Sequence, residues 1–175
     1  ALIRELSVLG RAGVRLANAS AVDLEDATLV AGKPATTGPS GVDGLAGLED
    51  EALRLRGTGP SSDPIGVARL DATASTAVAI RLFDLGTAAT FRATHATADE
   101  TAFAVSGAAG APIHAVDLTL DDSSDDTKAP RLRLAGASRL SLDGAEIHGS
   151  IFIEDAPGGL DMRQGQHPIA AAVVG

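Results

Sequence analysis

The densest group of chemically capable side chains is the acidic run 121–126, which reads DDSSDD. Its carboxylates are hard oxygen ligands of the kind that Ca²⁺ prefers, and two of them at a fixed gap would suit glycoside hydrolysis. That reaction needs carboxyls held roughly 5 to 9.5 Å apart, which a flexible acidic loop does not provide. We therefore interpret the run as a solvated loop rather than an acid–base pair, with loose Ca²⁺ binding as the lesser alternative.

The four histidines, at 95, 114, 148 and 167, are far apart and share no i, i+4 spacing. Metal ligation needs two or more histidines on one face, so these residues predict no metal centre. His148 holds a polar position in an alternating segment and should point outward. The chain has no Gly-x-Ser-x-Gly elbow and no cysteine, which removes that serine motif and any cysteine nucleophile. We predict no catalytic residue and no cofactor.

Composition limits the classes of partner. The formal net charge is −9, and an acidic chain repels phosphate backbones, so nucleic acid is not an expected partner. The longest apolar run is six residues, 169–174, far below the roughly 20 that span a bilayer, so this segment is not expected to insert into a membrane. Four phenylalanines are the only aromatic residues. We expect them to fill a core made mainly of Leu, Ile, Val and Ala.

The elements that must position any site are short strands. Windows such as 116–120, 132–135, 140–142 and 147–153 alternate apolar and polar residues with period two, the pattern of strands with one inward face. Frequent Gly, Asn and Asp breaks separate them, and such strands are too short for a sandwich. Residues 1–10 and 45–55 also show helical spacing. We predict strands for the first and allow a helical turn in the second.

An internal repeat strengthens this interpretation. Residues 14–31 (VRLANASAVDLEDATLVA) align without a gap onto 132–149 (LRLAGASRLSLDGAEIHG), 118 positions later. Two copies of an alternating aliphatic block indicate a chain built from stacked strand units. The alignment places Leu24 opposite Leu142, so we expect these two leucines to occupy equivalent inward positions.

The second copy resembles a known family. Residues 137–149 (ASRLSLDGAEIHG), with LSVLG at 6–10, are similar to the coils of pertactin-like autotransporter passengers. The earlier copy departs from that coil pattern at Asn18, Glu25 and Asp26. The resemblance implies a right-handed parallel β-helix that reaches the cell surface of a Gram-negative bacterium, or is secreted from it, through the periplasm. It further implies non-catalytic, adhesin-like or virulence-type binding of a host protein or extracellular-matrix component through loops.

We therefore predict an all-β fold, a right-handed parallel β-helix over 1–175 that forms one segment of a longer passenger and is monomeric. A period of five residues in parts of both repeat copies leaves the square β-helix of pentapeptide-repeat proteins as an alternative, although that period fails across 53–120. Two functional alternatives also stay open. They are a polysaccharide-acting β-helix enzyme, either a lyase or a hydrolase, and a purely structural solenoid.

Loops that leave a regular stack are where solenoids usually carry function. Composition predicts exposed loops near 33–47, 57–65, 93–101 and 121–130. The candidate partner-binding residues in these loops are Lys33, Asp43, Asp63, His95, Asp121, Asp122, Asp125, Asp126 and Lys128.

Overall fold

The computed structural model describes most of the chain as strands. The described residues are 1–10, 13–17, 21–32, 51–57, 63–75, 78–107, 111–122, 130–136, 139–156, 159–164 and 172–173. Within these ranges the protein is all-β and contains no helix. Accordingly, the described part of the chain has no helix long and apolar enough to cross a membrane.

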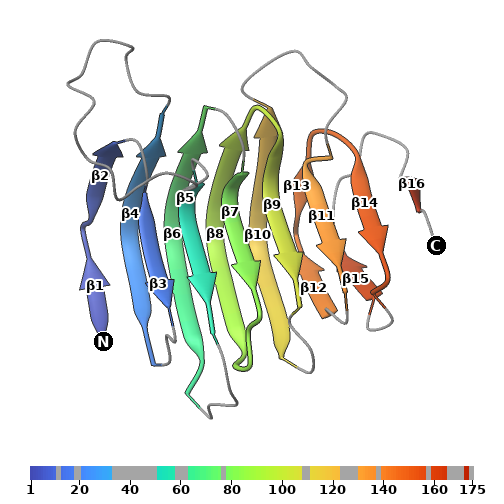
Figure 1. Ribbon diagram of the computed structural model, residues 1–175, viewed down its shortest axis with the longest axis horizontal. Coiled ribbons are helices and arrows are strands. Elements are labelled where there is room, and N and C mark those ends of the chain that lie inside the picture. Colours follow the sequence, from blue (N-terminus) through green and yellow to red (C-terminus); the bar gives the residue numbers. More distant parts are fainter. Residues whose placement is uncertain are drawn as a thin grey trace, which may run out of the picture.

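The strands form two parallel sheets, and along the chain they alternate between the two, except that β1 and β2, and β12 and β13, follow each other within one sheet (Figure 1). Sheet A contains β1 (Leu2–Arg4), β2 (Ser7–Gly10), β4 (Asp23–Ala31), β6 (Ile65–Ala74), β8 (Ala89–Ala98), β10 (Pro112–Asp122), β12 (Arg139–Asp143), β13 (Glu146–Ile147) and β15 (Gly159–Arg163). Sheet B contains β3 (Val14–Ala17), β5 (Glu51–Arg56), β7 (Val78–Phe83), β9 (Thr101–Ser106), β11 (Leu132–Ala135), β14 (Ile151–Glu154) and β16 (Ala172–Val173). We call one sheet A strand with the sheet B strand that follows it a layer. The stacking of such layers is compatible with a parallel β-helix.

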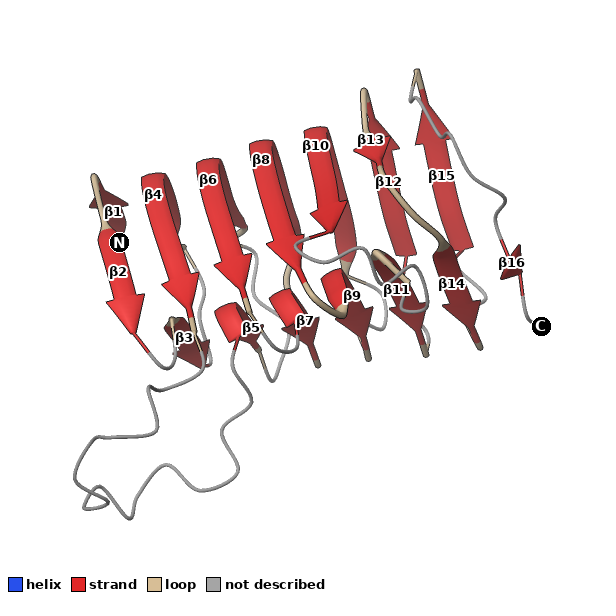
Figure 2. Ribbon diagram, turned by 90° about the horizontal axis from the view of Figure 1, so that it is seen from above, coloured by secondary structure: helices blue, strands red, loops and turns tan. Residues whose placement is uncertain are grey.

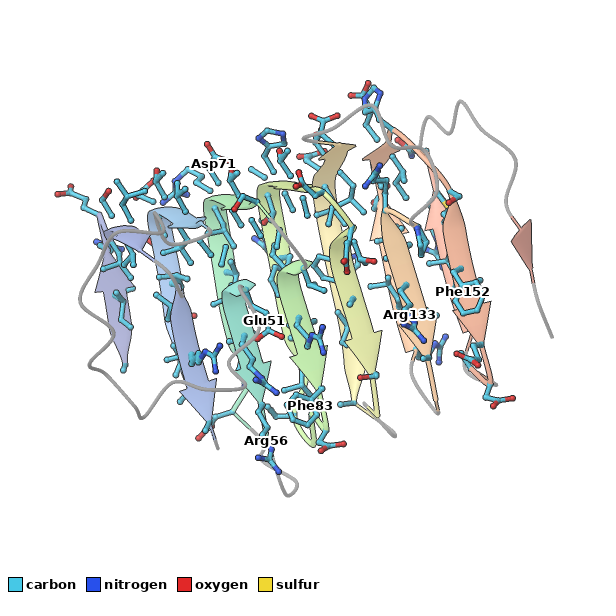
Figure 3. The ribbon with its side chains drawn as sticks, turned by 45° about the horizontal axis from the view of Figure 1, so that its top comes forward. Glu51, Arg56, Asp71, Phe83, Arg133 and Phe152 are labelled. Atoms are coloured by element: carbon cyan, nitrogen blue, oxygen red, sulfur yellow. The ribbon has the colours of Figure 1, made fainter. Side chains whose placement is uncertain are left out.

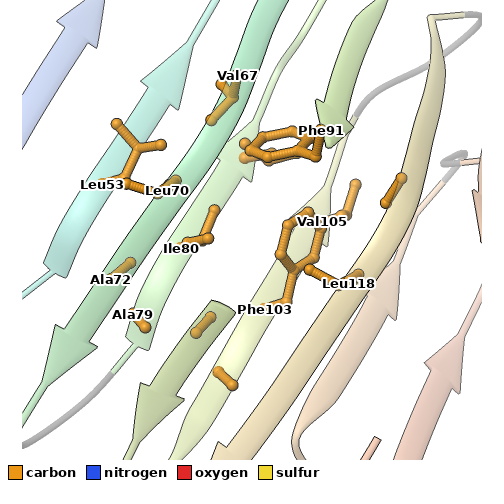
Figure 4. Close-up of a cluster of buried hydrophobic side chains, with 14 of the residues drawn as sticks. Leu53, Val67, Leu70, Ala72, Ala79, Ile80, Phe91, Phe103, Val105 and Leu118 are labelled. Atoms are coloured by element: carbon orange, nitrogen blue, oxygen red, sulfur yellow. The ribbon is translucent and has the colours of Figure 1, made fainter. Parts of the chain in front are cut away.

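Side-chain alternation explains why these segments are strands. In β6 the inward residues Ile65, Val67, Leu70, Ala72 and Ala74 are all buried, and the residues between them are not. The same alternation in neighbouring strands places a column of aliphatic side chains between the two sheets (Figure 4). Burying apolar surface in this way contributes about 25 cal/mol per Å², so the column is the main source of stability.

The phenylalanines divide between the core and the surface. Phe91 and Phe103 are fully buried and meet edge to face, with ring centroids 5.2 Å apart. Phe83 and Phe152 are only half-buried, and each lies against an arginine guanidinium. The prediction that the phenylalanines fill the core is confirmed for the first pair and wrong for the second, because the second pair occupies outward positions of sheet B.

Every long strand of sheet A bends at one residue with positive φ (Figure 2). In β6 the burial alternation skips one position at Arg69, so the strand has a first arm before this residue and a second arm after it. In successive layers the bend residues are Glu5, Asp26, Arg69, Ala93, Asp117, Gly144 and Gln164. The left-handed region disfavours residues with a Cβ. It persists here because parallel pairing continues on both sides of each bend.

The internal repeat corresponds to equivalent positions in different layers. Leu24 and Leu142 stand in one line of register partners across sheet A. The partners between them, in order, are Val67, Phe91 and Ala115. Both leucines are buried, at 1% and 0% exposure, which confirms the prediction that they are equivalent and inward. The first copy of the repeat starts at the first residue of β3, and the second copy starts at the first residue of β11. The described strands lie in two sheets rather than on the four faces of a square solenoid.

Several predicted irregular segments are strands. The prediction of a loop near 93–101 is wrong, because residues 93–98 complete β8 and Thr101 begins β9. The helical turn within 45–55 is wrong for residues 51–55, which belong to β5. The loop predicted at 57–65 extends too far, since Ile65 is a buried residue of β6. The segments 33–47, 58–62 and 123–129 lie outside the described residues.

Candidate functional site

A strip of hydrogen-bonding side chains crosses the second arm of sheet A. We call it the His–Asp strip, and its members come from four neighbouring layers. They are Asp71 of β6, His95 of β8, Asp121 of β10, and Glu146 and His148 at β13. Their side chains are between 38% and 57% exposed, so the strip is open to a partner while its groups contact one another.

His95 is the centre of the strip. Its Nδ1 lies 3.4 Å from Asp71 Oδ1, and its Nε2 lies 2.9 Å from Asp121 Oδ2. The hydroxyl of Thr97 is 3.3 Å from the same Nε2. An imidazole with a carboxylate at each nitrogen is fixed in orientation, because rotating the ring would break both contacts.

His148 extends the strip into the next layer. Its Nε2 lies 3.0 Å from Glu146 Oε1 and 3.8 Å from Asp121 Oδ1. Asp121 therefore stands between the two histidines, with one carboxylate oxygen directed at each. The backbone explains this placement, since the His148 amide donates to the Leu120 carbonyl at 2.9 Å and so continues the parallel pairing of β10 with β13.

The strip can act on a partner in two ways. Its carboxylates accept hydrogen bonds from hydroxyl or ammonium groups, and its imidazoles can donate, accept or transfer a proton. Among the described residues, no group of three or more His, Cys, Asp or Glu side chains has an arrangement that could hold a metal ion.

A charge pair lies at the bends beside the strip. Arg69 donates from Nε to Asp26 Oδ1 and from Nη2 to Asp26 Oδ2, the second bond being 2.9 Å long. The hydrogen bonds from Arg69 lower the pKa of the Asp26 carboxyl, and the same bonds raise the pKa of Arg69. Both residues are bend residues of adjacent layers, so the pair joins two left-handed turns across the sheet.

The structure brings two of the predicted site residues together and separates a third. His95 and Asp121 are in contact, but both belong to strands, so the prediction that they lie in loops is wrong. Asp122 follows Asp121 at the end of β10. Asp63 lies apart from the strip, before β6, where its carbonyl accepts a 2.9 Å hydrogen bond from the Thr87 hydroxyl. The remaining candidates, Lys33, Asp43, Asp125, Asp126 and Lys128, lie outside the described residues.

Sequence reasoning missed three members of the strip, namely Asp71, Glu146 and His148. The histidines are far apart in the sequence, but the fold places both His95 and His148 beside Asp121. The outward orientation predicted for His148 is confirmed, since its side chain is 46% exposed. The sequence did contain a signal for the strip, which is the near-regular spacing of its members. Asp71, His95, Asp121 and His148 follow one another at intervals of 24, 26 and 27 residues. Each step is close to one layer, because β6 and β8 pair at an offset of 24 residues.

No protein-family model, curated protein or solved structure matches this chain.

Proposed function

We propose that the chain is a segment of a right-handed parallel β-helix of the pertactin-like passenger type, which binds a host protein or extracellular-matrix component without catalysis. In this proposal a Gram-negative bacterium displays the segment at its surface or secretes it. Two parallel sheets with alternating strands support the fold part of the proposal. The coil-like block 137–149 supports it further, since its described residues form β12 and β13 of one layer.

The observation that carries the binding function is the His–Asp strip. Its groups are fixed by neighbouring strands rather than by a flexible loop, and they repeat from layer to layer along the stack. A fixed, half-exposed row of acceptors loses little conformational entropy on binding. Such a row suits the extended surface of a macromolecule, whereas small molecules are usually enclosed in concave pockets. Because the strip is rich in carboxylates, the complementary partner surface carries ammonium, guanidinium or hydroxyl groups.

The test is binding of the purified chain to a panel of purified extracellular-matrix proteins, measured by surface plasmon resonance. The site variant is Asp121→Asn with Glu146→Gln, and the control is Asp143→Asn with Asp161→Asn on the first arm of the same sheet. Both variants remove two negative charges. Binding that the site variant loses and the control keeps is the expected result. Equal binding by both variants would reject the strip, and no binding to any component would reject the function.

One observation favours a second candidate, a polysaccharide-acting enzyme. His95 lies between two carboxylates at 3.4 and 2.9 Å, an arrangement that could serve a general acid or base. The discriminating assay is the viscosity of acidic polysaccharide solutions incubated with the chain. A fall in viscosity that His95→Gln abolishes would favour the enzyme over the binding module.

A further inference from the structure

The outer face of sheet B carries a straight row of arginines. Arg15, Arg54 and Arg81 are register partners in β3, β5 and β7. The row is interrupted in β9 by Ala104 and continues with Arg133 in β11. Because neighbouring strands lie about 4.8 Å apart, the row repeats at about that spacing with one double step. We call these four residues the arginine row.

Contacts within sheet B hold the row and its neighbour Arg56 in place. Glu51 is fully buried, and its carboxylate lies 2.7 Å from Arg81 Nε and 3.5 Å from Arg54 Nε. The Cζ atoms of Arg54 and Arg56 lie 4.9 and 5.0 Å from the centroid of the Phe83 ring. Figure 3 shows Arg56 and Phe83 close together on sheet B. Cation–π contacts of this kind restrict the guanidinium groups. The arginines are thus positioned before a ligand arrives, which lowers the entropic cost of binding.

The interruption at Ala104 creates a recess between two arginines. Arg133 lies on the far side of the recess, over the Phe152 ring at 5.6 Å and 3.4 Å from a Glu154 oxygen. The recess has a volume of about 310 Å³, and its lining includes Val78, Arg81, Glu100, Thr101, Ala104 and Arg133. Cavities that bind small chemical units start at about this size.

Charge complementarity identifies the class of ligand. The sheet B strands contain five arginines and two glutamates, a formal charge of +3. The sheet A strands contain ten carboxylates and five arginines, a formal charge of −5. Stacked sheets lie about 10 Å apart, and physiological salt screens charges over about 8 Å. A ligand on the outer face of sheet B therefore responds to the local positive charge more than to the net charge of −9.

The shape and polarity of the face favour a polysaccharide among polyanions. Each sheet B strand presents about two outward side chains, as Arg54 and Arg56 do on β5. The outer face of sheet B therefore fits one extended chain and is too narrow for a duplex. The lining of the recess also includes Glu100, whose side chain ends in a carboxylate, and Thr101. A carboxylate repels a further anionic group but accepts hydrogen bonds from hydroxyls. The ligand must therefore alternate anionic groups with hydroxyl-bearing units.

We propose that the outer face of sheet B binds an extended acidic polysaccharide along the stack. Arg54, Arg56, Arg81 and Arg133 bind its sulfate or carboxylate groups, for which the guanidinium fork is suited. The recess over Ala104 receives a hydroxyl-bearing sugar unit between them. This assignment rests on the proposed function in one respect, namely that the chain meets its partner outside the cell.

The experiment uses the full chain and three probes, which are heparin, neutral dextran and single-stranded poly-dT. The site variant is Arg56→Gln with Arg133→Gln, both exposed on sheet B. The matched control is Arg139→Gln with Arg163→Gln, both exposed on sheet A. We expect heparin to bind, with affinity falling as salt rises. The site variant should lose at least tenfold in affinity and the control less than threefold, with unchanged circular dichroism in both.

The other outcomes overturn the assignment. Equal losses in the two variants would mean that sheet B is not the binding face. Poly-dT binding as tight as heparin would mean that the face takes any polyanion, and failure of heparin to bind would reject the ligand class. If heparin fails while a matrix protein still binds through the His–Asp strip, the inference fails and the proposed function stands. If neither binds, both fail.

Discussion

The two sheets share an inner face and differ on the outside. Toward the core both present Leu, Ile, Val, Ala and Phe side chains that are almost completely buried. Outward, sheet A carries the His–Asp strip and most of the carboxylates, whereas sheet B carries the arginine row and two phenylalanine rings. The inner face is constrained because every layer must stack on the next. The outer face is free of that constraint, so the two sheets can carry different chemistry on one scaffold.

The largest expected effect tests what the sheets share. Leu142 of sheet A and Leu134 of sheet B are both fully buried, so replacing either with Ala should lower the free energy of unfolding by about 2–5 kcal/mol. Chemical denaturation measures both. The outward neighbour variant Ser141→Ala should change stability by less than about 0.5 kcal/mol. A Leu142→Ala protein as stable as the Ser141→Ala control would contradict the register described for sheet A.

The next largest effect on stability should differ between the sheets, because their ion pairs differ in burial. Glu51 in sheet B is fully buried between two arginines, whereas Glu25 in sheet A is 28% exposed and pairs with Arg4 at 2.9 Å. Glu51→Gln should cost about 1–3 kcal/mol, because it leaves two guanidinium groups without their buried carboxylate. Glu25→Gln should cost about 1 kcal/mol or less, since exposed pairs contribute little. Equal costs in urea denaturation would show that burial of Glu51 does not strengthen its pairing.

A smaller effect concerns the bends, which occur within the long strands of sheet A and not within the described strands of sheet B. Ala93 has a φ of 48°, where a Cβ costs about 1–2 kcal/mol. Ala93→Gly should therefore stabilise the protein by up to about 1 kcal/mol, after the greater flexibility of glycine in the unfolded chain is counted. The control Ala96→Gly, in the straight second arm, should destabilise it. Loss of stability in both variants, measured by thermal unfolding, would argue against a left-handed residue at 93.

The smallest effect depends on pH. The Arg69 hydrogen bonds lower the pKa of Asp26, so the contribution of this carboxyl to stability is present above its unfolded pKa of about 4 and is lost as pH falls through the depressed folded value. Asp26→Asn should therefore lower the Tm slightly at pH 7, and the difference should disappear in acid. Both groups are exposed, so salt should weaken the effect. A Tm difference that grows on acidification would contradict this sign.

The sequence predicted the core better than the surface, for physical reasons. Period-two alternation and the 118-residue repeat depend on burial, which leaves a direct trace in residue type, and they placed Leu24 and Leu142 correctly. Segment 93–101 was misjudged because its inward residues include Thr94 and the small Ala96 and Ala98, whose composition resembles a loop. The His–Asp strip depends on the length of each layer, which varies between 24 and 27 residues across these strands. Alternation alone does not determine that length.

The proposed site for an acidic polysaccharide lies on sheet B and not on sheet A. The most direct measurement is arginine modification by phenylglyoxal, read by mass spectrometry with and without heparin. Heparin should protect Arg56 and Arg133 on sheet B and leave the labelling of Arg139 and Arg163 on sheet A unchanged. Protection of the sheet A arginines, or equal protection of both pairs, would contradict this placement of the site.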